Sequence, residues 1–171
     1  MADFKTLDGA MDLFSQVNGI GITNNVFMAL KNTNREAVKY GIAGGMAAGI
    51  GIGILVTGNA ESIFSGKFDA LLINQTESGM GFIPMHSKKI ILSTVKVENL
   101  EPDLESYAFI ANDSITEVKV KNFSLLNKKL QTVKIKVGGK NTLHLLARKQ
   151  EKLLPYQEEN FAKFMYQYQN K

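Results

Sequence analysis

Cysteine is absent from this chain of 171 residues, and only two histidines, His86 and His144, are present. The lack of cysteine excludes disulfide bonds, thiolate metal ligands and thiol nucleophiles, and it leaves the redox compartment open. Neither histidine has a second histidine or a paired carboxylate at a spacing suited to a metal site. We therefore expect neither a metal ion nor a cofactor.

The signatures of the common enzyme classes are missing as well. No serine lies in a GxSxG elbow, and no Lys-Ser/Thr pair follows the glycines around residue 50, as a phosphate-binding loop requires. Four acidic residues gather near a proline, namely Glu98, Glu101, Asp103 and Glu105. Such a cluster is more typical of a solvated loop than of a calcium site. Because each of these chemistries lacks at least one required partner, we expect a protein without enzymatic activity.

The first residues, MADFKTLDGAMDLF, are acidic and amphipathic, which is not the pattern of a secretory signal peptide. We therefore expect the protein to stay in the cytoplasm. Apolar residues recur three and four positions apart at Phe4, Leu7, Met11 and Phe14. This spacing predicts an amphipathic helix over residues 3–17 that packs on the rest of the protein. Residues 21–31 predict a short strand, or a hairpin turning at Asn24 and Asn25.

A continuous apolar stretch, IAGGMAAGIGIGILVT, occupies residues 42–57 of an otherwise polar chain. Glycines recur every four positions from the residue just before this stretch, at Gly41, Gly45, Gly49 and Gly53. In a helix these glycines share one smooth face on which a second backbone can approach closely, as in the GxxxG pairing of membrane helices. We expect these four glycines to carry helix packing or membrane contact.

The length of this glycine-rich helix does not decide whether it lies in a bilayer or is buried in protein. At about 1.5 Å per residue it reaches about 24 Å, which is shorter than the roughly 30 Å hydrocarbon core of a bilayer. Membrane insertion would therefore be marginal, or would take the form of a tight hairpin. The alternative is a soluble homo-oligomer in which the helix is buried at a subunit interface or within the chain. A membrane-active toxin or pore is a more remote third reading.

The rest of the chain is rich in strand signals followed by one helical pattern. The expected strands cover residues 68–75, 81–85, 90–97, 107–110, 115–123, 130–137 and 142–147. After Pro155, the stripe of Phe161, Phe164, Met165 and Tyr168 predicts an amphipathic C-terminal helix. The predicted fold class is α+β, a seven-stranded antiparallel barrel or sandwich with a capping helix, preceded by the amphipathic and glycine-rich helices. We divide the chain into residues 1–33, 34–60 and 64–171.

Lysine is plentiful between residues 119 and 140, where no acidic residue occurs. The candidate residues for binding an anionic surface are Lys88, Lys89, Lys119, Lys121, Lys128, Lys129, Lys134 and Lys136. A basic hairpin attracts phosphates, although lysine also simply occupies the solvated face of strands. We do not expect nucleic acid as a partner, because Phe123 is the only aromatic residue among these lysines that could stack on a base.

Two segments carry a resemblance to a known family. They are SITEVKVKNFSLLNKKLQTVKIKVGGKNTLHLL at residues 114–146 and LPYQEENFAKFMYQY at residues 154–168. The strand opening with Ser-Ile, the lysine-bearing hairpin, the Gly-Gly turn and the helix entered through Pro-Tyr-Gln resemble bacterial pleckstrin-homology-like (PH-like) domains. The resemblance covers residues 64–171, and the whole layout is similar to uncharacterised Gram-positive proteins with an N-terminal glycine-zipper segment.

The resemblance implies a lipid-binding, peptide-binding or structural module. Phosphoinositide recognition is not carried over, because the loop at residues 75–80 contains an acid and no base. We therefore expect a non-enzymatic, membrane-associated binding or scaffold module whose partner is an anionic membrane surface or a protein. The alternative is a soluble homo-oligomeric interaction domain with the glycine-rich helix buried at an interface.

Overall fold

The computed structural model describes residues 3–32, 64, 67–88, 95–124, 128–138 and 141–169. The glycine-rich stretch, with Gly41, Gly45, Gly49 and Gly53, lies outside the described residues, and so does Lys89. The predictions made for these positions therefore stay predictions.

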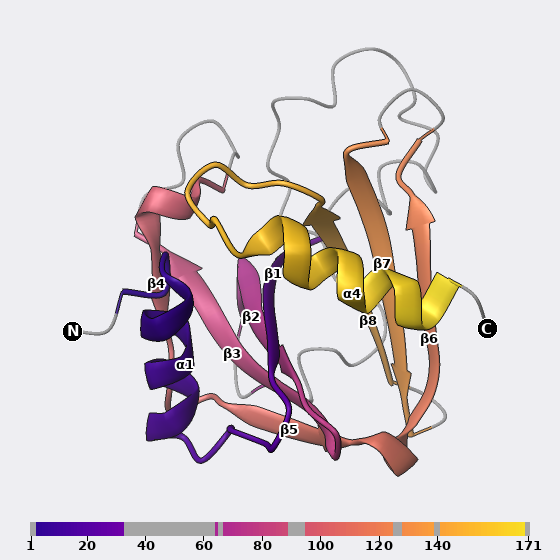
Figure 1. Cartoon of the computed structure of the whole chain (residues 1–171), viewed down its shortest axis with the longest axis horizontal. Helices are drawn as coiled ribbons and strands as arrows, with labels where there is room; N and C mark the ends of the chain where they lie inside the picture. The colour runs from indigo at the N-terminus through magenta and orange to yellow at the C-terminus, as the bar shows by residue number, and fades with distance from the viewer. Residues whose placement is uncertain are drawn as a thin grey trace.

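The described residues form one antiparallel eight-stranded sheet with a helix near each end of the chain (Figure 1). The strands are β1 (Asn25–Lys31), β2 (Ala70–Gln75), β3 (Gly79–Ser87), β4 (Leu100–Pro102), β5 (Ala108–Ala111), β6 (Ile115–Asn122), β7 (Leu130–Val137) and β8 (Asn141–Arg148). Their order in the sheet is β4-β3-β2-β1-β8-β7-β6, and β5 pairs with β3. This arrangement confirms the predicted α+β class with an antiparallel sheet and a C-terminal helix.

One predicted strand is wrong where the structure describes it. Of the expected strand at residues 90–97, positions 90–94 lie outside the described residues and Val97 opens the 3-10 helix η1 (Val97–Asn99). The strand β4 follows, at a place where the sequence predicted an acidic loop. Leu100 is buried and pairs with Ser87 at the end of β3, so a single apolar anchor is enough for this short strand. Pro102 is tolerated because β4 lies at the edge of the sheet.

β1 lies in the middle of the sheet, although it comes from the segment 1–33. It pairs with β2 from Asn25↔Gln75 to Leu30↔Ala70, and with β8 at Leu30↔Leu146. The residues between Val26 and Ala29 are buried. β1 therefore joins the strands β2 to β4 to the strands β6 to β8, and no hairpin forms at Asn24.

The helix α1 (Leu7–Gln16) has well-defined ends. The Thr6 hydroxyl caps its N-terminus by accepting a hydrogen bond from the Gly9 amide at 3.1 Å. At the other end Asn18 adopts a φ of 55°, and the Gly19 amide donates to the Phe14 carbonyl. This left-handed residue ends the helix as a Schellman motif does.

The buried face of α1 differs from the predicted stripe. Leu7 is 42% exposed, whereas Ala10, Leu13 and Phe14 are buried. Because the helix starts only at Leu7, Phe4 precedes it and does not share its periodicity. The buried face is therefore the i, i+3, i+4 set that begins at Ala10.

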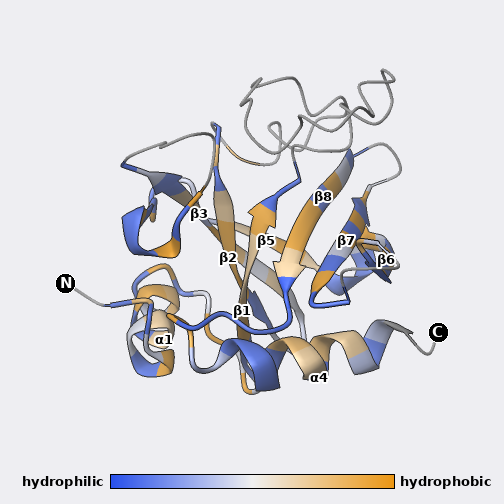
Figure 2. Ribbon diagram, turned by 90° about the horizontal axis from the view of Figure 1, so that it is seen from above, coloured by the Kyte–Doolittle hydropathy of each residue, from blue (hydrophilic) through white to orange (hydrophobic). Residues whose placement is uncertain are grey.

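The sheet buries a separate apolar cluster on each face. One cluster joins residues of β1, β2 and β3 to α1 and to Phe4. The other, which we call the inner cluster, joins apolar residues of β1 and of β6 to β8 to the helix α4 (Gln157–Gln169). Phe161 and Phe164 of α4 are fully buried there against Phe27, as the predicted C-terminal stripe requires. Alternating polar and apolar bands on β6 and β7 mark the two faces of these strands (Figure 2).

Side-chain amides of α4 form hydrogen bonds to the backbone of β1 at residues that are not paired with β8. The Met28 amide donates to Gln157 Oε1 at 2.8 Å, and Gln157 Nε2 donates to the Met28 carbonyl at 3.0 Å and to the Arg148 carbonyl at 2.9 Å. Asn160 Nδ2 donates to the Val26 carbonyl at 2.9 Å. These amides satisfy buried backbone groups that have no strand partner at this point.

Candidate functional site

The lysine face is the outer face of β6 and β7, and it consists of Glu117, Lys119, Lys121, Lys134 and Lys136. Strand pairing places Glu117 opposite Lys136 and Lys119 opposite Lys134. The apolar residues that alternate with them, Val120, Val133 and Ile135, belong to the inner cluster. Since α4 also packs on the inner cluster, it leaves the lysine face open to solvent, and the side chains of Lys119, Lys134 and Lys136 are 32–53% exposed.

Glu117 is the centre of this face. Its Oε1 lies 2.7 Å from Lys119 Nζ, and its Oε2 lies 3.3 Å from Lys134 Nζ and 3.3 Å from Lys136 Nζ. The ammonium group of Lys119, followed by those of Lys134 and Lys136, lowers the pKa of Glu117 from 4.5 to about 2. The carboxylate is therefore ionised throughout the neutral range, and one negative charge is shared among three ammonium groups.

Glu117 also has a local structural role. Lys119 and Lys134 are like charges directly across an antiparallel pair, an arrangement that destabilises a sheet. The carboxylate beside them offsets this repulsion. Glu117 was not a candidate from the sequence because it precedes the run of lysines that begins at Lys119, and only the antiparallel register brings it next to Lys136.

The remaining candidate lysines are placed differently. Lys121 lies on the lysine face and makes no ion pair with the described residues, whereas Lys128 and Lys129 precede β7 at the far end of the hairpin. Lys88 follows β3 and forms an ion pair with Glu101 next to it on β4. The structure thus brings together Lys119, Lys121, Lys134 and Lys136, and it separates Lys88 from them.

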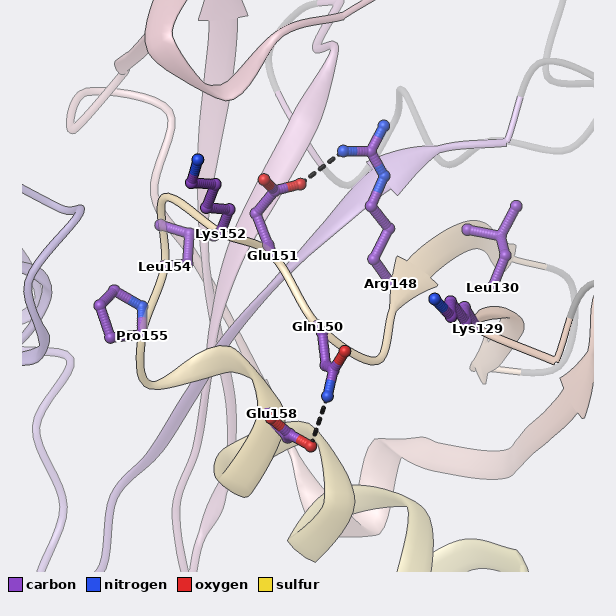
Figure 3. A pocket seen from close by; sticks show the side chains of 9 residues that line it. All are labelled: Lys129, Leu130, Arg148, Gln150, Glu151, Lys152, Leu154, Pro155 and Glu158. Carbon is purple, nitrogen blue, oxygen red and sulfur yellow. Dashed lines mark hydrogen bonds and ion pairs between the residues drawn. The ribbon is translucent and has the colours of Figure 1, made fainter.

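A shallow hollow of about 730 Å³ lies between the start of β7, the end of β8 and the start of α4 (Figure 3). Its charged lining consists of Lys129, Arg148, Glu151, Lys152 and Glu158. Arg148 pairs with Glu151, and Gln150 donates to Glu158 at 2.7 Å. Of this charged lining only Lys129 was a candidate from the sequence, although the charged run RKQEK at residues 148–152 was a signal for the others. The mixed charges give the hollow no clear preference for one sign of ligand.

The histidines are not joined in a catalytic arrangement within the part of the chain that the structure describes. His86 Nε2 lies 3.3 Å from Asp103 Oδ2 at a partly buried position, and His144 lies opposite Lys134 on β8. A hydrogen bond from Ser106, assisted by His86, lowers the pKa of Asp103. The described ranges contain no group of three or more metal-ligating side chains. They also contain no helix with the length and apolar character needed to cross a membrane.

No protein-family model, no curated protein and no solved structure matches this chain.

Proposed function

We propose that this protein is a non-enzymatic binding module with a PH-like domain that docks on an anionic membrane surface through the lysine face. The observation that supports this proposal is the gathering of four lysines on one side of β6 and β7, open to solvent, around a single acid. Each lysine near an anionic lipid surface contributes about 1 kcal/mol of attraction. The lysine face would therefore give reversible binding that weakens as salt rises.

The fold is consistent with the PH-like part of the proposal. Strands β2 to β8 are followed by α4, whose phenylalanines fill the inner cluster and whose amides complete β1. We propose in addition a role for the glycine-rich stretch between β1 and β2. Its glycines Gly41, Gly45, Gly49 and Gly53 would insert into the same membrane or pair with a second copy of the chain. A surface charge and an apolar segment together give stable anchoring where either alone gives marginal binding.

The proposal is tested by removing three lysines from the lysine face. The triple variant Lys119→Gln, Lys134→Gln, Lys136→Gln should partition about 100-fold less onto vesicles of phosphatidylglycerol and phosphatidylcholine, because three contributions of about 1 kcal/mol are lost. Partition is measured by vesicle sedimentation of the full chain at about 0.1 M salt, where the Debye length is about 10 Å and charges far from the membrane are screened.

A matched control removes three other lysines that also pair with acids. In the control variant Lys88→Gln, Lys96→Gln, Lys163→Gln, the partners left behind are Glu101, Glu98 and Glu159. The control has the same net charge as the test variant and should bind within about threefold of the wild type, because its lysines lie off the lysine face. Equal losses in both variants would argue against a defined face. A wild-type chain that does not bind the vesicles and forms an oligomer in solution would favour the soluble homo-oligomer instead.

A further inference from the structure

We infer that Glu117 is an intramolecular counter-ion of the lysine face, and that an anionic surface must replace Glu117 as the partner of the lysines. The lysine face therefore binds a surface of dense negative charge in preference to isolated anions. This inference rests on the proposed function and names the regulation of the same site. It assigns to Glu117 a role in selectivity in addition to its role in the sheet.

The geometry gives one carboxylate to three ammonium groups. Oε1 of Glu117 forms an ion pair with Lys119, Oε2 forms ion pairs with Lys134 and Lys136 without a hydrogen bond, and the side chain is only 24% exposed. The three lysine side chains are more exposed than the carboxylate that they surround. The ammonium groups can therefore turn outward to a surface while Glu117 remains in the sheet.

Competition with an attached carboxylate sets a threshold. A single anion from solution offers the lysines one charge, which Glu117 already supplies at the high effective concentration of a neighbouring side chain. A membrane with many anionic headgroups offers several charges at once, and each lysine that turns to it adds to the attraction. Binding should therefore rise steeply with the anionic fraction of the membrane.

A purely structural Glu117 would behave differently. If the carboxylate served only to offset the repulsion between Lys119 and Lys134, its removal would weaken the sheet. Membrane binding would then change only as much as for any other substitution that removes one negative charge. Our inference expects two opposite effects of the same substitution, namely a less stable fold and a stronger attraction to anionic membranes.

The experiment compares Glu117→Gln with the wild type and with Glu159→Gln. Glu159 pairs with Lys163 at 2.7 Å on the outside of α4, so its substitution changes the net charge equally. Partition of the full chain is measured on phosphatidylcholine vesicles with increasing fractions of phosphatidylglycerol. Glu117→Gln should bind about fivefold more strongly and reach half-binding at a lower anionic fraction, while Glu159→Gln should stay within about twofold of the wild type.

A second readout uses the wild-type chain and does not depend on how the variant folds. On anionic bicelles the lysines should leave Glu117, so the pKa of its carboxyl group, followed by ¹³C NMR, should rise from about 2 towards 4.5. Equal binding of Glu117→Gln and Glu159→Gln, or an unchanged Glu117 pKa on bicelles that the protein binds, would overturn the inference and leave the proposed function standing. Absence of wild-type binding even to pure anionic vesicles would instead overturn the proposed function.

Discussion

Replacing Gln157 by leucine is expected to lower the free energy of unfolding by about 2 to 4 kcal/mol. Gln157 is 1% exposed, and its amide group is bonded to the Met28 amide, the Met28 carbonyl and the Arg148 carbonyl. Leucine has a similar volume but can neither donate nor accept. The buried amide and carbonyl of Met28 would therefore lose these partners, at about 1 to 2 kcal/mol each. The Arg148 carbonyl is only partly buried, so its loss costs less. The measurement is urea unfolding followed by circular dichroism.

The control for this prediction is Gln150→Leu. Gln150 is exposed, and among the described residues its amide is bonded only to the side chain of Glu158 in the first turn of α4. Its substitution should change the free energy of unfolding by less than about 0.5 kcal/mol. If the two variants unfold at the same urea concentration, the amide contacts between α4 and β1 contribute less than the structure indicates.

Replacing Phe164 by alanine is expected to cost about 3 to 5 kcal/mol, because it leaves a cavity in the inner cluster. Phe164 is fully buried, with its ring centroid 4.6 Å from that of Phe27 and 4.9 Å from that of Tyr168. A loss of this size is a large fraction of the stability of a small domain. The midpoint temperature of thermal unfolding should fall strongly, and the amides of α4 should be the first to lose protection against hydrogen exchange.

Tyr166→Ala is the control on the same helix. Tyr166 is 78% exposed, so its removal takes little apolar area out of the core. We expect a change of less than about 1 kcal/mol. A Phe164→Ala variant that unfolds like Tyr166→Ala would show that α4 packs on the sheet more loosely than the ring contacts suggest.

The strands with clear alternation could be predicted from the sequence, and so could α4. In β7, Lys134 and Lys136 alternate with buried Val133 and Ile135, and the Gly-Gly turn after this strand places Gly138 at a φ of 55°. Local patterns of this kind report which face of an element is buried. The central position of β1 could not be predicted in this way, because its partner β8 lies far away in the sequence and its neighbour β2 follows only after the glycine-rich stretch.

The candidate site was predicted only in part, for the same reason. The alternation placed Lys119, Lys121, Lys134 and Lys136 on one wet face, as the structure also has them. The role of Glu117 depends on the register of β6 and β7, which alternation alone does not fix. The pairing of Lys88 with Glu101 depends on β4, which the sequence represented as a loop.

The most direct test of the central claim is lysine footprinting of the full chain on vesicles. An amine-reactive acetylating reagent is applied to the protein with neutral and with anionic vesicles, and modification is read at each lysine by mass spectrometry. Our account predicts that Lys119, Lys121, Lys134 and Lys136 become protected on anionic vesicles while Lys163 on α4 reacts as before. Uniform reactivity of these lysines on vesicles that bind the protein, or protection centred on Lys163, would contradict the account.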